Sequence, residues 1–115
     1  MELADLMVGD WVYISGKPVK ITKDKLEMLL FIDDGSGISP IPLTKDILVK
    51  NSYKSTQGLD FYWLDDKKHC CIKNYDGKRL FCYKQGINDV WLIVKYVHQL
   101  QHLLQLCGIE KEITL

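Results

Sequence analysis

Four short apolar segments separated by turn residues constrain the fold of this chain more than any other feature. They occupy residues 59–64, 69–75, 78–84 and 89–95. Their length and their aromatic and β-branched residues are typical of β-strands. Because strands that follow closely in the chain usually pair with each other, the sequence predicts an antiparallel β-meander.

The hairpin between the second and third segments has two interpretations. The residues Asn-Tyr-Asp-Gly at 74–77 favour a type I turn followed by a left-handed glycine,. This three-residue loop would place Cys70 opposite Cys82. A two-residue loop would shift the register by one residue and place Cys71 opposite Cys82 instead. In either register we expect packed thiols rather than a disulfide.

One face of this hairpin is a candidate binding surface. In the favoured register it carries Lys73, Arg79, Phe81 and Tyr83 together. Aromatic rings beside basic side chains on a sheet face are typical of proteins that bind single-stranded nucleic acid. The alternative is that the N-terminal lobe or a second subunit covers this face.

The N-terminal part predicts a small, bent antiparallel unit of SH3-like type. Residues 8–13 form its first expected strand, a turn follows at residues 16–18, and the return strand covers residues 19–22. The apolar run at residues 26–32 is expected to be a third strand, and the Asp- and Gly-rich residues 33–37 a loop. The likeness is one of fold and implies no function.

Two helices complete the expected fold, which is of the α+β class. Thr44 is a candidate N-cap for a short linking helix over residues 44–52,. A C-terminal helix over residues 96–107 is expected to pack on the meander and to end before Gly108. We interpret the chain as a single domain, residues 1–115, with an N-terminal β lobe at about 1–43 and the meander and last helix at about 57–108.

His98 and His102 are spaced four residues apart on the last helix, as two metal ligands would be. At 100° per residue both fall on the polar side of the helix, whereas Cys107 falls on the apolar side,. Two ligands do not complete a structural zinc site, and the H-E-x-x-H motif is absent. We therefore expect a polar helix face and no metal. Leu106 is the apolar residue that breaks this pattern.

The sequence contains no constellation that supports catalysis. Paired aspartates at residues 33–34 and 65–66 lie in expected turns, where aspartate is favoured for local hydrogen bonds,. Cys71, with His69 two residues away, is the remaining thiol that could serve as a nucleophile, but this pair is geometrically loose. We expect no enzyme activity and no cofactor.

Charge and composition narrow the partner classes. The chain has 15 Lys and Arg and 15 Asp and Glu, so its formal net charge is zero, which argues against a dedicated nucleic-acid binder,. It has no secretory leader pattern and no apolar run near the roughly 18 residues of a membrane helix. We expect a cytoplasmic protein with no membrane partner.

Three separated segments carry a family resemblance. Their matching positions are Leu6, Gly9, Asp10 and Val12; Pro40, Ile41, Leu43 and Thr44; and His98, Leu100, Gln101 and Leu103. The pattern resembles a family of small uncharacterised proteins from gut anaerobes and their prophages or mobile elements, with His102 where Asn is usual. The resemblance implies no activity, but it implies an accessory role in binding a protein of the host or of the mobile element.

Together these features favour a non-enzymatic protein-interaction module. A homodimer is one form of it, because apolar residues occupy both faces of several expected strands, more than one helix can cover. The alternative is a single-stranded nucleic-acid binder that uses Lys73, Arg79, Phe81 and Tyr83.

Overall fold

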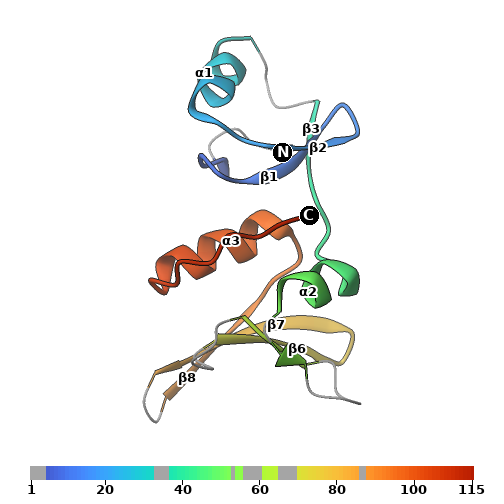
Figure 1. The fold of residues 1–115 in the computed structure, drawn as a ribbon, viewed down its shortest axis with the longest axis vertical. Coiled ribbons are helices and arrows are strands. Elements are labelled where there is room, and N and C mark those ends of the chain that lie inside the picture. The colour runs from blue at the N-terminus through green and yellow to red at the C-terminus, as the bar shows by residue number, and fades with distance from the viewer. Residues whose placement is uncertain (1–4, 33–36, 53, 56–60, 65–69, 86–87) are drawn as a thin grey trace. The chain divides into compact units, whose positions relative to one another are not determined.

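The structure is a computed structural model that describes residues 5–32, 37–52, 54–55, 61–64, 70–85 and 88–115. Within these ranges it contains three helices, a three-stranded sheet and a five-stranded sheet, both antiparallel (Figure 1). The predicted α+β class is therefore confirmed.

The chain divides into two compact units, and each unit consists of two segments that are separated in the sequence. Unit 1 comprises Met1–Pro42 with Tyr96–His98, and unit 2 comprises Leu43–Lys95 with Gln99–Leu115. The single-domain organisation stays a prediction. The loop expected at residues 33–37 and the turn expected at 65–68 lie outside the described residues, Gly37 excepted.

Unit 1 is built on a three-stranded sheet with the order β2-β1-β3. The strands are β1 (Trp11–Ile14), β2 (Lys17–Lys20) and β3 (Ile38–Pro40). Ser15 and Gly16 join β1 to β2, and both have positive φ, 51° and 80°, as a two-residue type I′ turn requires,. The core of the unit consists of Leu6, Val12, Ile21, Leu29 and Ile38.

The segment before β1 is held by its own hydrogen bonds. Met7 N donates to Asp10 Oδ2 at 2.9 Å, and Asp10 N donates to Met7 O at 3.1 Å. Gly9 has φ 97°, a conformation that L side chains avoid, and its N donates to Ile21 O at 2.7 Å,. The Gly-Asp pair therefore fixes the direction in which the chain enters β1.

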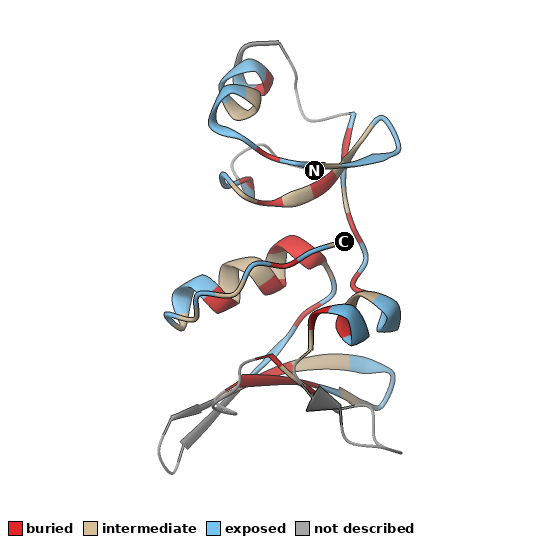
Figure 2. Ribbon diagram, viewed as in Figure 1, coloured by how far each residue is buried: buried red, intermediate tan, exposed pale blue. Residues whose placement is uncertain are grey.

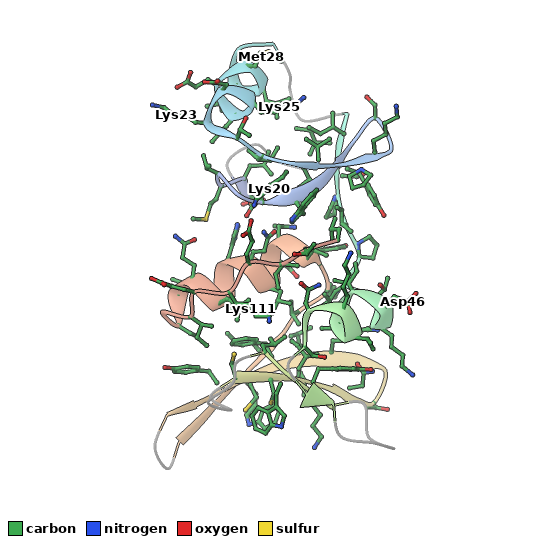
Figure 3. All side chains as sticks on the ribbon, viewed as in Figure 1. Lys20, Lys23, Lys25, Met28, Asp46 and Lys111 are labelled. Carbon is green, nitrogen blue, oxygen red and sulfur yellow. The ribbon has the colours of Figure 1, made fainter. Side chains whose placement is uncertain are left out.

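The strand expected at residues 26–32 is wrong, because this segment belongs to helix α1 (Lys23–Ile32). Thr22 Oγ1 accepts from Lys25 N at 3.2 Å and so caps the first turn,. Leu26 and Leu29 pack into the core of unit 1, whereas Met28 lies on the outer side of the helix and is 52% exposed (Figure 3). A short apolar run fits a strand or a helix equally well, and here the cap and the three-residue spacing identify the helix.

Unit 2 contains the predicted meander. Its sheet has the order β4-β5-β6-β7-β8, so each strand pairs with the next one in the chain. The strands are β4 (Lys54–Ser55), β5 (Phe61–Trp63), β6 (Cys70–Tyr75), β7 (Lys78–Gln85) and β8 (Asn88–Ile93).

The β6–β7 hairpin has a two-residue loop, so the favoured three-residue interpretation is wrong and the alternative is right. Tyr75 pairs with Lys78, and Cys71 pairs with Cys82. Asp76 and Gly77 have φ 51° and 74°. Positive φ at both central residues gives a type I′ turn, whose twist matches that of the flanking strands.

Helix α2 (Lys45–Asn51) confirms the predicted linking helix and its cap, since Thr44 Oγ1 accepts from Ile47 N at 3.3 Å. Its last residue, Asn51, binds a segment 63 residues away: Nδ2 donates to Thr114 O at 2.7 Å, and Oδ1 accepts from Thr114 N at 2.8 Å. Nδ2 also donates to Ile47 O at 2.8 Å. The buried Asn51 amide thus pairs with the chain near residue 114 as a peptide group would,.

Helix α3 (Val97–Leu106) confirms the predicted C-terminal helix, and Gly108 follows it with φ 72°,. Together with α2 it lies over one face of the five-stranded sheet (Figure 1). Leu100 and Leu104 are buried on α3, and Leu48 is buried on α2. Figure 2 shows this burial along the helix and the central strands.

The solvent-facing position expected for His98 is wrong, since its side chain is only 8% exposed. The helical projection at 100° per residue assumed that the helix packs on the meander alone. The structure instead assigns Tyr96–His98, at the start of the helix, to unit 1. The His98 ring stacks on Tyr96 with centroids 5.9 Å apart. His102 and Cys107 are half-buried, and Leu106 is 82% exposed.

Candidate functional site: the open face and free edge of the five-stranded sheet

The observed register divides the predicted binding surface between the two faces of the sheet. Side chains alternate along a strand, and residues directly opposite each other share a face. Lys73 pairs with Leu80, whereas Phe81 and Tyr83 pair with Ile72 and Cys70. Lys73 therefore lies on the face opposite to Arg79, Phe81 and Tyr83, and the four residues form no common surface. Whether any of them contacts a partner stays a prediction.

Phe81 lies on the face that the helices cover, which we call the core face. Phe81, Ile72 and Cys70 each have no exposed surface, and Tyr62 beside them is 3% exposed. Arg79 and Tyr83 are half-buried on this face. A nucleic-acid base could not stack on Phe81 without removing it from the core.

The other face, which we call the open face, carries a row of four residues across four strands. Across the strands β5, β6, β7 and β8 this row consists, in order, of Trp63, Cys71, Cys82 and Trp91. Cys71 and Cys82 are 1% and 0% exposed, whereas Trp91 is 45% exposed. The two buried thiols therefore lie between two tryptophans in one row of the sheet.

The next row of the open face adds apolar and basic side chains. Lys73, Leu80 and Ile93 lie opposite one another on β6, β7 and β8. Ile93 is 55% exposed, Leu80 is half-buried, and Lys73 is exposed. Lys78, two residues before Leu80, is exposed on the same face. Among the residues whose side chains are described, the open face therefore carries Trp91 and Ile93 on β8, Lys73 on β6 and Lys78 on β7.

Strand β8 is also an edge of the sheet. Val94 N donates to Arg79 O at 3.0 Å, which makes this a hydrogen-bonded pair. Such pairs alternate with pairs that exchange no hydrogen bonds, so Ile93 and Trp91 direct their N–H and C=O groups away from β7. The next residue, Leu92, faces the core side and is still 43% exposed. We call residues 91–93 with their outward backbone groups the free edge.

Residues 91–93 include no lysine or proline, and the described part of the chain places no further strand beside them. Natural sheets block their edges with lysine, proline, a bulge or a covering element. The three consecutive residues Trp91, Leu92 and Ile93 are instead large, apolar and exposed on both sides of the strand. This combination suits the addition of another strand.

Sequence reasoning missed the tryptophans because it placed the site on β6 and β7. The alternation of Trp91 and Ile93 in β8 was visible, but its meaning depends on strand order, which makes β8 an edge. The position of Trp63 opposite Cys71 follows only from the register.

The described residues provide little for metal or thiol chemistry. Within the described ranges, no three His, Cys, Asp or Glu side chains gather in a way that could hold a metal ion. All four cysteines are free thiols, and the candidate nucleophile Cys71 is 1% exposed. Its suggested partner His69 lies outside the described residues. Burial raises the pKa of the Cys107 thiol, which disfavours its reactive thiolate form,.

Comparisons with known proteins found no match to this chain among family models, curated proteins or solved structures. In the part of the chain that the structure describes, no helix is long and apolar enough to cross a membrane.

Proposed function

We propose that this protein is a non-enzymatic interaction module whose partner protein adds a strand along the free edge. The observation that carries this proposal is the exposure of Trp91, Leu92 and Ile93 on an edge strand, at 45%, 43% and 55%. In an accessory protein of a prophage or mobile element, this partner would belong to the host or to the element itself, and binding would take place in the cytoplasm.

The partner segment follows from the chemistry of the free edge. Backbone groups of Trp91 and Ile93 would pair with an extended segment and supply affinity. The alternate side chains of that segment would lie over the open face, beside Trp91 and Ile93. Lys73 and Lys78 on the same face favour a segment with apolar and acidic residues, and they disfavour a face-to-face contact between two copies of the chain.

The test compares two substitutions that place a lysine at equally exposed positions. Ile93 on β8 and Val49 on α2 are each 55% exposed. Lysine at an edge strand opposes strand addition, so Ile93→Lys should abolish partner binding while Val49→Lys preserves it. The measurement is a nuclease-treated pull-down from the native host, followed by titration of the identified partner against both variants. Equal binding by both variants would contradict the proposal.

Hydrogen exchange reports the same contact at single residues. In the free chain the outward amides of Trp91 and Ile93 should exchange faster than the inward amides of Leu92 and Val94. The partner should slow the two outward amides selectively. Sedimentation of the isolated chain shows whether the partner is a second copy: a dimer that Ile93→Lys dissociates would identify an antiparallel β8–β8 contact.

A second candidate function is single-stranded nucleic-acid binding on the open face. The specific observation is that Trp63, Trp91, Lys73 and Lys78 share this face. Exposed rings beside lysines provide stacking and phosphate contacts. Binding of a labelled oligonucleotide should then weaken with salt and on Trp91→Ala or Lys73→Gln. Affinity that is indifferent to salt and to both substitutions would exclude this candidate.

A further inference from the structure

A pocket of about 230 Å³ lies at the end of the five-stranded sheet nearest the Asp76–Gly77 turn. It belongs entirely to unit 2. Its lining consists of Leu43, Gly77, Lys78, Arg79, Ile93, Val94 and Lys95. Three of these seven residues are basic and none is acidic.

Two backbone hydrogen bonds, and one from a backbone amide to a side chain, join the residues that line the pocket to neighbouring segments. Val94 N donates to Arg79 O at 3.0 Å, which joins the walls from β7 and β8. Leu43 N donates to Lys95 O at 2.9 Å, and Lys95 N donates to Gln99 Oε1 at 2.9 Å. These bonds fix the Cα positions from which two of the basic side chains extend, so the pocket exists before any ligand arrives.

Arg79 is the residue in this lining that lacks an acceptor. Its Nε is buried and has no hydrogen-bond partner among the described residues. A buried donor without an acceptor is costly, and Arg79, which lines the pocket, would recover that cost by turning its guanidinium toward an anion bound there,. Lys78 and Lys95 are exposed, so the pocket is accessible to a solute from their side.

Two of the three basic residues follow the type I′ turn directly. Lys78 and Arg79 are consecutive, so Lys78 lies on the open face and Arg79 on the core face of the sheet,. The acidic residue nearest in sequence, Asp76, is exposed in the turn and does not line the pocket.

We propose that this pocket binds a phosphate group, either as free phosphate or as a phosphomonoester. Three cationic side chains and no lining carboxylate suit a dianion better than a single carboxylate. The guanidinium also offers paired donors whose geometry matches phosphate oxygens. Strand addition at the free edge and phosphate binding here are separate properties, although Ile93 contributes to both surfaces.

The test is a titration of the isotopically labelled full chain at constant pH and ionic strength, followed by amide ¹H–¹⁵N spectra. The arms are inorganic phosphate, adenosine 5′-monophosphate, a short oligonucleotide and acetate. Saturable shifts centred on Gly77, Lys78, Arg79 and Lys95 with phosphate, and much weaker ones with acetate, would support the proposal. Tighter binding of the mononucleotide at the same amides would identify a phosphomonoester as the preferred source.

Two substitutions and a matched control make this test specific. Arg79→Gln and Lys95→Gln should each weaken phosphate binding by about tenfold or more, because each removes a charge-assisted hydrogen bond. Lys45→Gln on α2, an exposed lysine of the same unit outside the pocket and outside the open face, should leave it unchanged. Lys95 is exposed, so its variant remains informative if Arg79→Gln fails to fold.

Three results would overturn the proposal: no saturable shift with phosphate, acetate binding as tight as phosphate binding, or an equal loss in Lys45→Gln. Shifts produced only by the oligonucleotide and spread over the open face would also overturn it. That last result would instead support the second candidate function.

Discussion

The core face and the open face of the five-stranded sheet are built from the same strands, yet burial has a different cause on each. On the core face, Ile72 and Phe81 are fully buried because α2 and α3 lie over them. On the open face, Cys71 and Cys82 are equally buried, but their neighbours across the strands are Trp63 and Trp91 rather than a helix. A buried residue in a sheet therefore does not identify the core by itself.

The largest expected effect is the difference in free energy of unfolding between a substitution on the core face and one on the open face. Phe81→Ala removes a large, fully buried ring and should lower the free energy of unfolding by about 3–5 kcal/mol,. Ile93→Ala on the open face should cost about 1 kcal/mol or less, because much of that side chain is already in water. Urea denaturation monitored by circular dichroism measures both variants. Similar losses would mean that the open face is covered as well.

A smaller effect on the free energy of unfolding is expected at the Asp76–Gly77 turn, whose length determines which residues of β6 and β7 share a face. Gly77 has φ 74°, so Gly77→Ala should cost about 1–2 kcal/mol through left-handed strain,. Asp76→Asn is the matched control, since asparagine adopts the left-handed conformation readily and should leave stability unchanged. Thermal unfolding of the two variants measures the difference, and a tolerated alanine at residue 77 would argue against the type I′ turn.

A comparable effect on stability accompanies a change in thiol exposure. Trp91→Ala should lower the free energy of unfolding by about 1–2 kcal/mol, because about half of the indole is already in water,. It should also speed alkylation of Cys82 on the open face and leave Cys70 on the core face unchanged. Mass spectrometry of the native chain after brief treatment with iodoacetamide distinguishes the thiols. Faster reaction at both would indicate general loosening rather than loss of a local cover.

Cys107 serves as the internal reference in that experiment. Its thiol is partly accessible, and burial raises its pKa, so less thiolate is present at a given pH than in the unfolded chain,. The raised pKa contributes stability below the ordinary thiol range, and this contribution is lost as the pH rises through the raised value. Its alkylation should therefore accelerate with pH in the wild type and in Trp91→Ala alike.

Local signals predicted the parts of the fold that depend on few residues. The cap at Thr44, the glycine after α3 and the succession of strands in unit 2 are each determined by neighbouring residues. The hairpin register was less certain because Asn-Tyr-Asp-Gly fits two loops. One residue of difference moved Phe81 from the expected surface into the core,.

The features that the sequence did not predict depend on distant parts of the chain. His98 is buried because Tyr96–His98 belong to unit 1, which a helical wheel cannot show. The free edge depends on strand order, and the phosphate pocket depends on Leu43, Arg79 and Lys95 meeting at one end of a sheet. Of the candidate surface, Lys73 is exposed, and Arg79 lines the pocket.

The pairing of Asn51 with Thr114 has a consequence for synthesis on the ribosome. Asn51 leaves the ribosome long before Thr114 is made, since 63 residues separate them. Until then its amide must remain hydrated, because burial without a partner is costly. Unit 2 therefore cannot close around α2 during translation. We expect its final assembly to wait until residue 114 has left the ribosome, and the nascent chain to expose its apolar strands to chaperones until that time.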